Sequence, residues 1–277
     1  MVFFMRTIDE NQIKKIKKFI FKNSRLLERR LFSFFFEKGK KNDVIKALVA
    51  YQNLDGGFGN GIEPDLLCPE SSAIGAETAM YYFDLLDYVD NEITDQLFNW
   101  IIKEQNEEGY INHPPKNMYN YPFQEWWSGP DDLRIFALAG FLKKWGLGDI
   151  AFFKKVKKFY TNSSLPIEFK IYDYPYFIYL KYLGENKVEK EMLQHIINQF
   201  PNIFEKNKEH YPLFGRHWYH ALDNVDKKVL ENEAENFFNG LEDDGGLKII
   251  YQNLHHWRPI WTLDGLILLK KSSMIEF

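Results

Sequence analysis

The segment 124–132, with the sequence QEWWSGPDD, holds the densest group of side chains that could do chemistry. A carboxyl group buried beside a second one can keep its proton near neutral pH, so Asp131 or Asp132 could act as an acid. The ring faces of Trp126 and Trp127 could stabilise a nearby positive charge. The alternative is structural, with Asp131 capping the next helix and Asp132 in solvent. On the first interpretation the aspartates are candidate catalytic residues and the tryptophans candidate ligand contacts.

A second pair of carboxylates, Glu63 and Asp65, follows the glycine-rich stretch 55–61, DGGFGNG. Loops that lead into helices carry functional side chains more often than core segments do, so both are further candidate catalytic groups. The competing explanation is a helix N-terminus stabilised by acidic side chains. The glycine-rich stretch follows a helical pattern and not a strand, which argues against a nucleotide-phosphate loop.

Two later segments, HWYH and HHWRPIW, place histidine next to tryptophan. Their candidate ligand-binding residues are His217, Trp218, Trp257, Arg258 and Trp261. His217 and His220 could share a metal with a carboxylate, but a structural role is the stronger expectation. The single cysteine, Cys68, excludes an internal disulfide and a cysteine-cluster zinc site. The motifs HExxH and GxSxG do not occur, and the sequence predicts no metal and no cofactor.

Helices must position these side chains, because apolar residues recur at helical spacing nearly everywhere, as at Ile93, Leu97 and Ile101. No segment shows sustained two-residue alternation between turns, so a β-sheet core is not expected. A chain of 277 residues with 45% hydrophobic residues can form one large globular domain. The pattern predicts an all-α fold with about twelve helices.

Helix ends and helix starts alternate along the chain. An acidic residue and glycine follow amphipathic segments at 55–57, 108–109 and 244–246, where glycine supplies the left-handed turn that ends a helix. We expect Gly56 or Gly57 to have a positive φ. Proline precedes apolar segments at Pro69, Pro130, Pro175, Pro212 and Pro259, and proline suits the first position of a helix.

The two signals together define a repeat of about 45 residues, a period typical of helical repeat proteins. About six such units fill residues 1–277, and the apolar last unit favours a closed ring over an open solenoid with polar ends. We therefore predict a single α/α-toroid domain over 1–277 with inner and outer helix layers. The helices near Pro69, Pro130, Pro175 and Pro259 should lie inside, and a basic helix pair over 1–41 should pack on the domain.

The stretch 52–59, QNLDGGFG, resembles the Gln…Gly…aromatic repeat of terpenoid cyclases and protein prenyltransferases. The sharpest part, 55–65, is similar to small bacterial prenyltransferase-like proteins with a DGGFG…EPD segment. The resemblance implies an α/α toroid. The sequence SGPDD lacks the first aspartate of the Asp-x-Asp-Asp motif by which such cyclases protonate an alkene, and the Asp-Asp-x-x-Asp magnesium motif is absent. Cys68 and Asp65 do not have the spacing of the prenyltransferase zinc ligands.

Charge is unevenly distributed along the chain. Residues 1–41 hold twelve Lys or Arg and four Asp or Glu, a balance of +8, so the remainder must carry −12 to give the net charge of −4. The basic helices could make peripheral contact with an anionic membrane, although a solvated helix face is the commoner explanation. The acidic remainder argues against nucleic-acid binding. No secretory signal or spanning segment is evident, which predicts a cytoplasmic protein.

Three functions fit these patterns. The first is a terpenoid cyclase or prenyltransferase-like enzyme that acts on an isoprenoid or other apolar ligand in an aromatic-lined central cavity, as the resemblance and 17% aromatic residues suggest. The second is a carbohydrate-active glycosidase or lyase with two carboxylates and tryptophan platforms. The third is a non-catalytic toroid that binds a peptide or protein. In all three the candidate residues should meet at one mouth of the ring.

Overall fold

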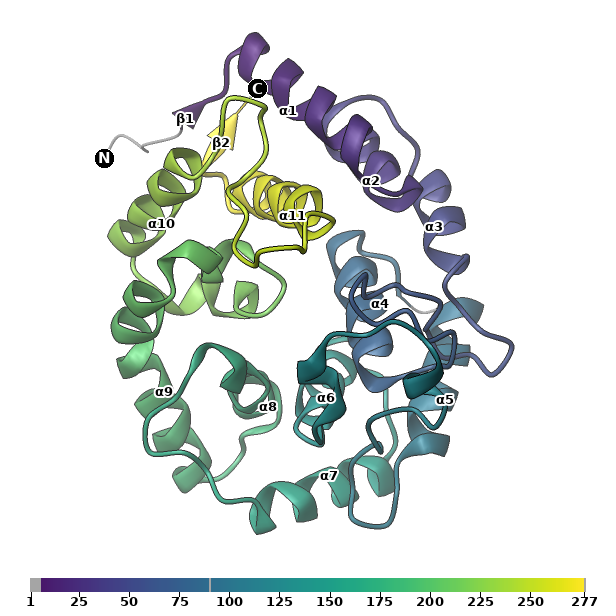
Figure 1. Ribbon diagram of the computed structural model, residues 1–277. Coiled ribbons are helices and arrows are strands. Elements are labelled where there is room, and N and C mark those ends of the chain that lie inside the picture. The colour runs from purple at the N-terminus through teal and green to yellow at the C-terminus, as the bar shows by residue number, and fades with distance from the viewer. Residues whose placement is uncertain (1–5, 90, 277) are drawn as a thin grey trace. The chain divides into compact units, whose positions relative to one another are not determined.

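The computed structural model describes residues 6–89 and 91–276, which are almost entirely helices and loops (Figure 1). Its α-helices are α1 (Glu10–Asn23), α2 (Leu26–Phe36), α3 (Lys41–Val49), α4 (Ala73–Leu85), α5 (Glu92–Glu104), α6 (Arg134–Lys144), α7 (Ile150–Asn162), α8 (Tyr174–Leu183), α9 (Lys187–Lys206), α10 (Lys227–Asn239) and α11 (Trp257–Lys271). Short 3-10 helices lie at Met118–Asn120, Glu125–Ser128, Ile171–Asp173, Lys208–His210, Pro212–Phe214 and Tyr219–Asn224. The predicted all-α class is confirmed, with eleven α-helices among the described residues.

The chain forms two compact units, one of Leu48–Ile196 and one of Met1–Ala47 with Ile197–Phe277. They are called here the central unit and the terminal unit. The predicted single toroidal domain remains a prediction.

In the central unit, α6 packs against both α4 and α8. These three helices are buried on nearly every side, as their almost uninterrupted apolar sequences require. Helices α5 and α7 bury one face each and contact α4 and α6 respectively. Each amphipathic helix begins at a side-chain cap, Asn91 for α5 and Asp149 for α7. The unit thus has a fully buried group of helices flanked by amphipathic ones.

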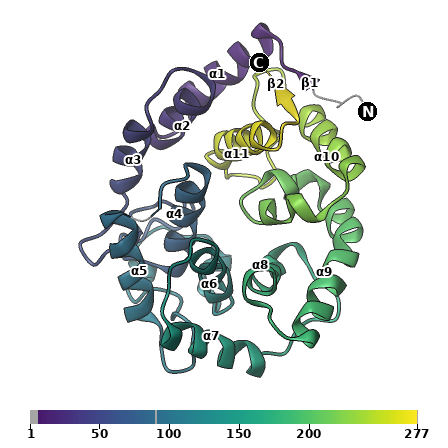
Figure 2. The same cartoon turned by 180° about the vertical axis from the view of Figure 1, so that it is seen from behind.

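In the terminal unit, α11 is the buried helix, and α1 and α2 both pack against it. Helices α1 and α2 lie within the basic segment 1–41 and both contact α11. The strands β1 (Arg6–Thr7) and β2 (Ile275–Glu276) pair in parallel, with Arg6 opposite Ile275. Seen from behind, this pair lies beside α10 and α11 (Figure 2). The first and last described segments of the chain are thus held together.

The turn that combines acid and glycine has the same construction in three places. Each turn closes with an isolated antiparallel bridge, at Gln52–Phe58, Gln105–Ile111 and Leu241–Leu247. Gly56, Gly109 and Gly245 have φ of 92°, 107° and 91°, so the predicted positive φ is confirmed at Gly56. Gln52 Nε2 donates to the carbonyls of Gly56 and Ile93, and Gln105 Nε2 donates to those of Gly109 and Phe152. The glutamine thus joins each of these two turns to the next amphipathic helix.

The positive-φ glycines also touch that next helix. A Cβ on Gly56 would lie 2.4 Å from the Gln96 carbonyl oxygen in α5, and one on Gly109 would lie 2.4 Å from that of Lys155 in α7. A Cβ on Gly245 would lie 2.7 Å from the Lys15 carbonyl carbon in α1. The turn after α10 therefore meets α1 as the turn after α3 meets α5.

The prolines mark helix starts less uniformly than expected. Pro175 and Pro259 lie in the first turns of α8 and α11, and Pro212 begins a 3-10 helix. Pro69 and Pro130 precede α4 and α6 as predicted, but they lie in the loops before these helices and not in their first turns. Helix α4 begins at Ala73 because the Ser72 side chain accepts the Gly75 N–H.

One buried carboxyl group of the terminal unit has an unusual environment. Glu233 on α10 is 9% exposed, and its Oε2 has no hydrogen-bond partner within the described residues. Burial, with the charge of Glu205 adding to it, raises the pKa of Glu233 to about 7. The folded protein therefore binds a proton at Glu233 more tightly than the unfolded chain does.

We expect Gly56→Ala to destabilise the protein by about 3 kcal/mol, because it combines a strained φ with a backbone clash. Gly146→Ala is the matched control, since Gly146 has φ of 73° but nothing within 4 Å of an added Cβ. Its cost should be about 1 kcal/mol. Denaturant unfolding measures both, and equal losses would contradict the predicted contact with Gln96.

Stability from protonated Glu233 should be fully present below its unfolded pKa of about 4.3 and lost as pH rises through about 7. The loss should be about 3 kcal/mol between roughly pH 4.5 and pH 8. Urea unfolding of the natural protein and of Glu233→Gln across this range isolates the contribution, because the variant should lack it. Glu235→Gln, at an exposed position of the same helix, should behave as the natural protein.

Candidate functional site

A polar network joins the N-terminal parts of α4, α6 and α8 in the central unit. Arg134 Nη1 donates to Glu77 Oε2 at 2.7 Å, and the Tyr174 hydroxyl donates to Glu77 Oε1 at 2.7 Å. Arg134 also donates to the Tyr174 hydroxyl, and its Nε donates to Asp131 Oδ2 at 2.9 Å. One guanidinium therefore connects three buried helices and the loop before α6.

Burial sets the electrostatics of this network. It raises the pKa of Glu77, and the Arg134 charge opposes that shift in part. Burial also disfavours the charge on Arg134, but Asp131 and Glu77 outweigh it and hold the Arg134 pKa well above its usual range. Burial raises the pKa of Tyr174 well above its usual value, so its hydroxyl stays protonated and donates. Arg134 is thus a permanent cation between carboxylates.

Glu63 and Asp65 lie beside this network and are both buried. The Thr78 hydroxyl, next to Glu77 on α4, donates to Glu63 Oε1. Trp127 Nε1 donates to Asp65 Oδ1 at 3.0 Å, and the backbone N–H of Gln124 donates to the Asp65 carbonyl at 3.0 Å. The structure thus brings Asp65 and Trp127, 62 residues apart, into contact.

The loop that carries Trp127 is fixed by its own small apolar core. Leu66, Cys68, Ile74 and Met118 form a buried cluster, with Phe123 and Trp127 packed against it. Burial raises the pKa of the Cys68 thiol, which fits a packing role and not a nucleophile.

His113 adds a basic nitrogen to the site. Its Nε2 lies 2.9 Å from the Trp127 carbonyl oxygen, and because a carbonyl only accepts, Nε2 must carry the hydrogen. Burial lowers the pKa of His113, with Asp131 opposing the shift. The ring is therefore neutral near pH 7. Its Nδ1 atom carries a lone pair and has no hydrogen-bond partner within the described residues.

Asp131 and Asp132, the candidate acids, have different surroundings from each other. The Asp131 carboxylate pairs with Arg134 at 2.9 Å. Asp132 is half-buried, and its charge acts on the Tyr176 hydroxyl, whose pKa burial raises to about 12. Trp126 is 50% exposed. Arg134 pairs with two carboxylates, Asp131 and Glu77, so carboxylates outnumber the cation in this network.

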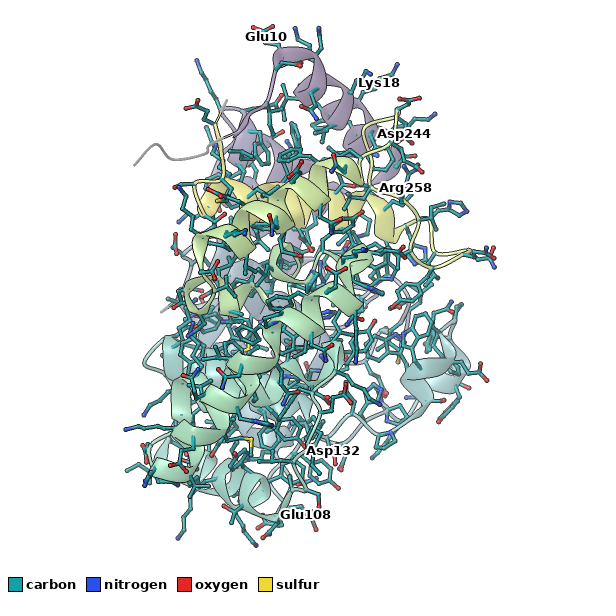
Figure 3. All side chains as sticks on the ribbon, turned by 90° about the vertical axis from the view of Figure 1, so that its left-hand side faces the viewer. Glu10, Lys18, Glu108, Asp132, Asp244 and Arg258 are labelled. Atoms are coloured by element: carbon teal, nitrogen blue, oxygen red, sulfur yellow. The ribbon has the colours of Figure 1, made fainter. Side chains whose placement is uncertain are left out.

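The remaining candidates lie in the terminal unit, where packing accounts for two of them. Trp218 is fully buried and meets the stacked rings of Phe200 and Phe204 edge to face. Arg258 donates to Asp244 and Glu242 and lies 4.7 Å from the Phe19 ring centre. Figure 3 shows Arg258 beside Asp244 on the side where Lys18 lies. In this structure Trp218 is a core residue and Arg258 closes a turn, so their ligand-contact roles remain predictions.

Trp257 and Trp261 stack on each other with ring centres 5.4 Å apart. The Arg216 guanidinium lies 5.5 Å from the Trp257 ring and pairs with buried Asp264 at 2.9 Å. His217, next to Arg216, is half-buried. These contacts stay within the terminal unit, and a common mouth with Asp131 and Trp127 remains a prediction.

Sequence reasoning missed Glu77, Arg134, Tyr174 and His113 as site residues. The signal for the first two was present. Glu77 is the single charged residue in the stretch AIGAETAMYYF, and Arg134 opens the apolar helix RIFALAGFL. A charged residue among apolar residues on a buried helix needs a partner of opposite charge. Glu77 and Arg134 each indicate such a partner. No comparable signal marked Tyr174 or His113.

Metal ligands, membrane-spanning helices, surface hollows and similarity to known proteins each bear on the function of the chain. Within residues 6–89 and 91–276, no group of three or more His, Cys, Asp or Glu is placed to hold a metal ion. In the same residues no helix is both long and apolar enough to cross a membrane. An open hollow in the terminal unit is lined by Leu241, Glu242, Asp243 and Asp244. No family model matches the chain, and neither a curated protein nor a solved structure does so significantly.

We expect Arg134→Met to destabilise the protein by about 3–5 kcal/mol, because it leaves Glu77 buried without its cation. Lys155→Met is the control, since it removes an exposed pair with Glu107 and should cost less than about 1 kcal/mol. Chemical denaturation measures both variants. A loss at Arg134 no larger than the control would show that the network contributes little to the fold.

Proposed function

We propose that the protein is an α/α toroid of the terpenoid cyclase type, and that its central-unit site binds an isoprenoid ligand that is uncharged or positively charged. The site comprises the side chains around Arg134, Asp65 and Trp127. The observation that carries the proposal is the excess of carboxylates over cations, within the central unit, beside a fixed indole ring.

The toroid part rests on the repeated turn. The turn after α10 meets α1 through Gly245 and Lys15, as the turns after α3 and α5 meet α5 and α7. When the last turn of a repeat array packs on its first amphipathic helix, the apolar surface at both ends is covered. Such an array needs no polar capping units. The β1–β2 pairing, in the same unit, supports this closure.

The ligand class rests on charge. A diphosphate would meet the carboxylates of the site and a guanidinium that already pairs with two of them. A cation, or a neutral chain that develops positive charge, would meet favourable charge and the quadrupole of Trp127. If a proton is transferred to the ligand, Glu77 is the carboxyl group whose pKa burial raises.

Three probes with one farnesyl chain test the charge preference: farnesol, protonated N,N-dimethylfarnesylamine and farnesyl diphosphate. We expect the amine to bind about tenfold more tightly than the alcohol, and the diphosphate to bind most weakly. Calorimetry and tryptophan fluorescence below the aggregation limit of each probe give the affinities. Tighter binding of the diphosphate, or no binding of any probe, would contradict the proposal.

Variants assign that preference to the site. Asp65→Asn keeps an acceptor for Trp127 Nε1 but removes a charge, and Asp132→Asn removes a second. Each should weaken amine binding about fivefold while farnesol binding changes little. Glu108→Gln, an exposed carboxylate of the same unit labelled in Figure 3, is the control and should leave both affinities unchanged.

A further inference from the structure

An exposed aromatic surface, separate from the buried network, lies on two joined loops of the central unit. Its apolar members are Leu67, Tyr119, Tyr121 and Trp126, with exposed fractions of 44%, 61%, 41% and 50%. We call these four residues the aromatic platform. Single exposed rings are ordinary, but three within eight residues of one loop call for an explanation.

The platform is rigid, because its two loops are bonded to each other. Leu67 N–H donates to the Pro122 carbonyl at 3.0 Å, and Leu66 forms an antiparallel bridge with Phe123. Asn117 donates to Glu70 through its backbone N–H at 3.0 Å and its side chain at 2.6 Å. The Tyr119 ring meets Phe123 edge to face at 5.5 Å. A ligand would therefore find the rings already placed, without a large ordering cost.

The platform carries little net charge, because Glu70 of the other loop adds only one carboxylate to the segment 115–129, and it is rich in amides. The segment 115–129 contains one lysine, Lys116, and one glutamate, Glu125. Asn117 and Asn120 are exposed and Gln124 is half-buried, all within that segment. Amide groups donate to and accept from hydroxyls, while flat rings stack on the C–H faces of sugars. An anionic ligand or lipid surface would gain no charge attraction here.

From these features we propose that the aromatic platform is a binding surface for a neutral glycan chain. Trp126 and Tyr119 are the stacking rings, and Asn120 and Gln124 are the hydroxyl partners. The teal segment that carries the platform stands out from the long helices of the same unit (Figure 3). This surface shares its loop with Trp127 of the isoprenoid site but consists of different, exposed side chains.

The test uses the full chain and four neutral hexasaccharides: β-1,4-glucose, α-1,4-glucose, β-1,4-mannose and β-1,4-N-acetylglucosamine. Calorimetry should show binding of at least one. Trp126→Ala and Tyr119→Ala should each weaken it about tenfold. Tyr172→Ala is the matched control, because Tyr172 is a similarly exposed tyrosine (54%) of the same unit outside the platform. Thermal melts should show that all three variants fold as the natural protein does.

Several outcomes would overturn the proposal. They are the absence of binding to all four glycans at millimolar concentration, equal weakening by Tyr172→Ala, and unchanged affinity in Trp126→Ala. Sedimentation with phosphatidylcholine vesicles that depends on Trp126, without glycan binding, would identify a lipid surface instead. Asp132→Asn should weaken amine binding but retain glycan binding. The two measurements therefore distinguish a failure of the isoprenoid proposal from a failure of this one.

Discussion

A guanidinium that is largely removed from water must be paired, and the pairing of Arg134 organises the central unit. Its partners come from the loop before α6 and from α4, and Tyr174 of α8 completes the arrangement. Because each partner lies at the N-terminal part of its element, the charge fixes how three otherwise apolar helices are aligned. Apolar packing alone would tolerate sliding of such helices, whereas hydrogen bonds of defined direction do not.

The second constraint is the repeated turn. Glycine at positive φ lets the backbone approach the next helix more closely than a side chain would allow, and glutamine joins the two. The same arrangement occurs at sites far apart in sequence. It supplies a scaffold on which loops can vary, and the loops at 60–71 and 113–132 are where this chain places its unusual side chains.

Aromatic residues serve two purposes in this protein. Most are packing groups, as Trp218 against Phe200 and Phe204 illustrates. A few have faces in contact with solvent or with fixed polar partners, and Trp126 and Trp127 are adjacent examples of each. Composition alone could not separate these uses, because the same aromatic ring can pack in a hydrophobic core or contact a ligand.

Sequence alone determined the helical class and the acid–glycine turns, because helical periodicity and the need for glycine at positive φ are local properties. It also identified Asp65 and Trp127 as site candidates, although not as partners. It predicted helices after Pro69 and Pro130, but local caps and turns decide at which residue each helix begins. Only the tertiary structure decided that Arg134 takes up Asp131 and Glu77, that Arg258 closes a turn, and that Trp218 is core. The reason is that an ion pair or a packed ring depends on partners from distant parts of the chain, and one residue's neighbours in sequence do not specify them.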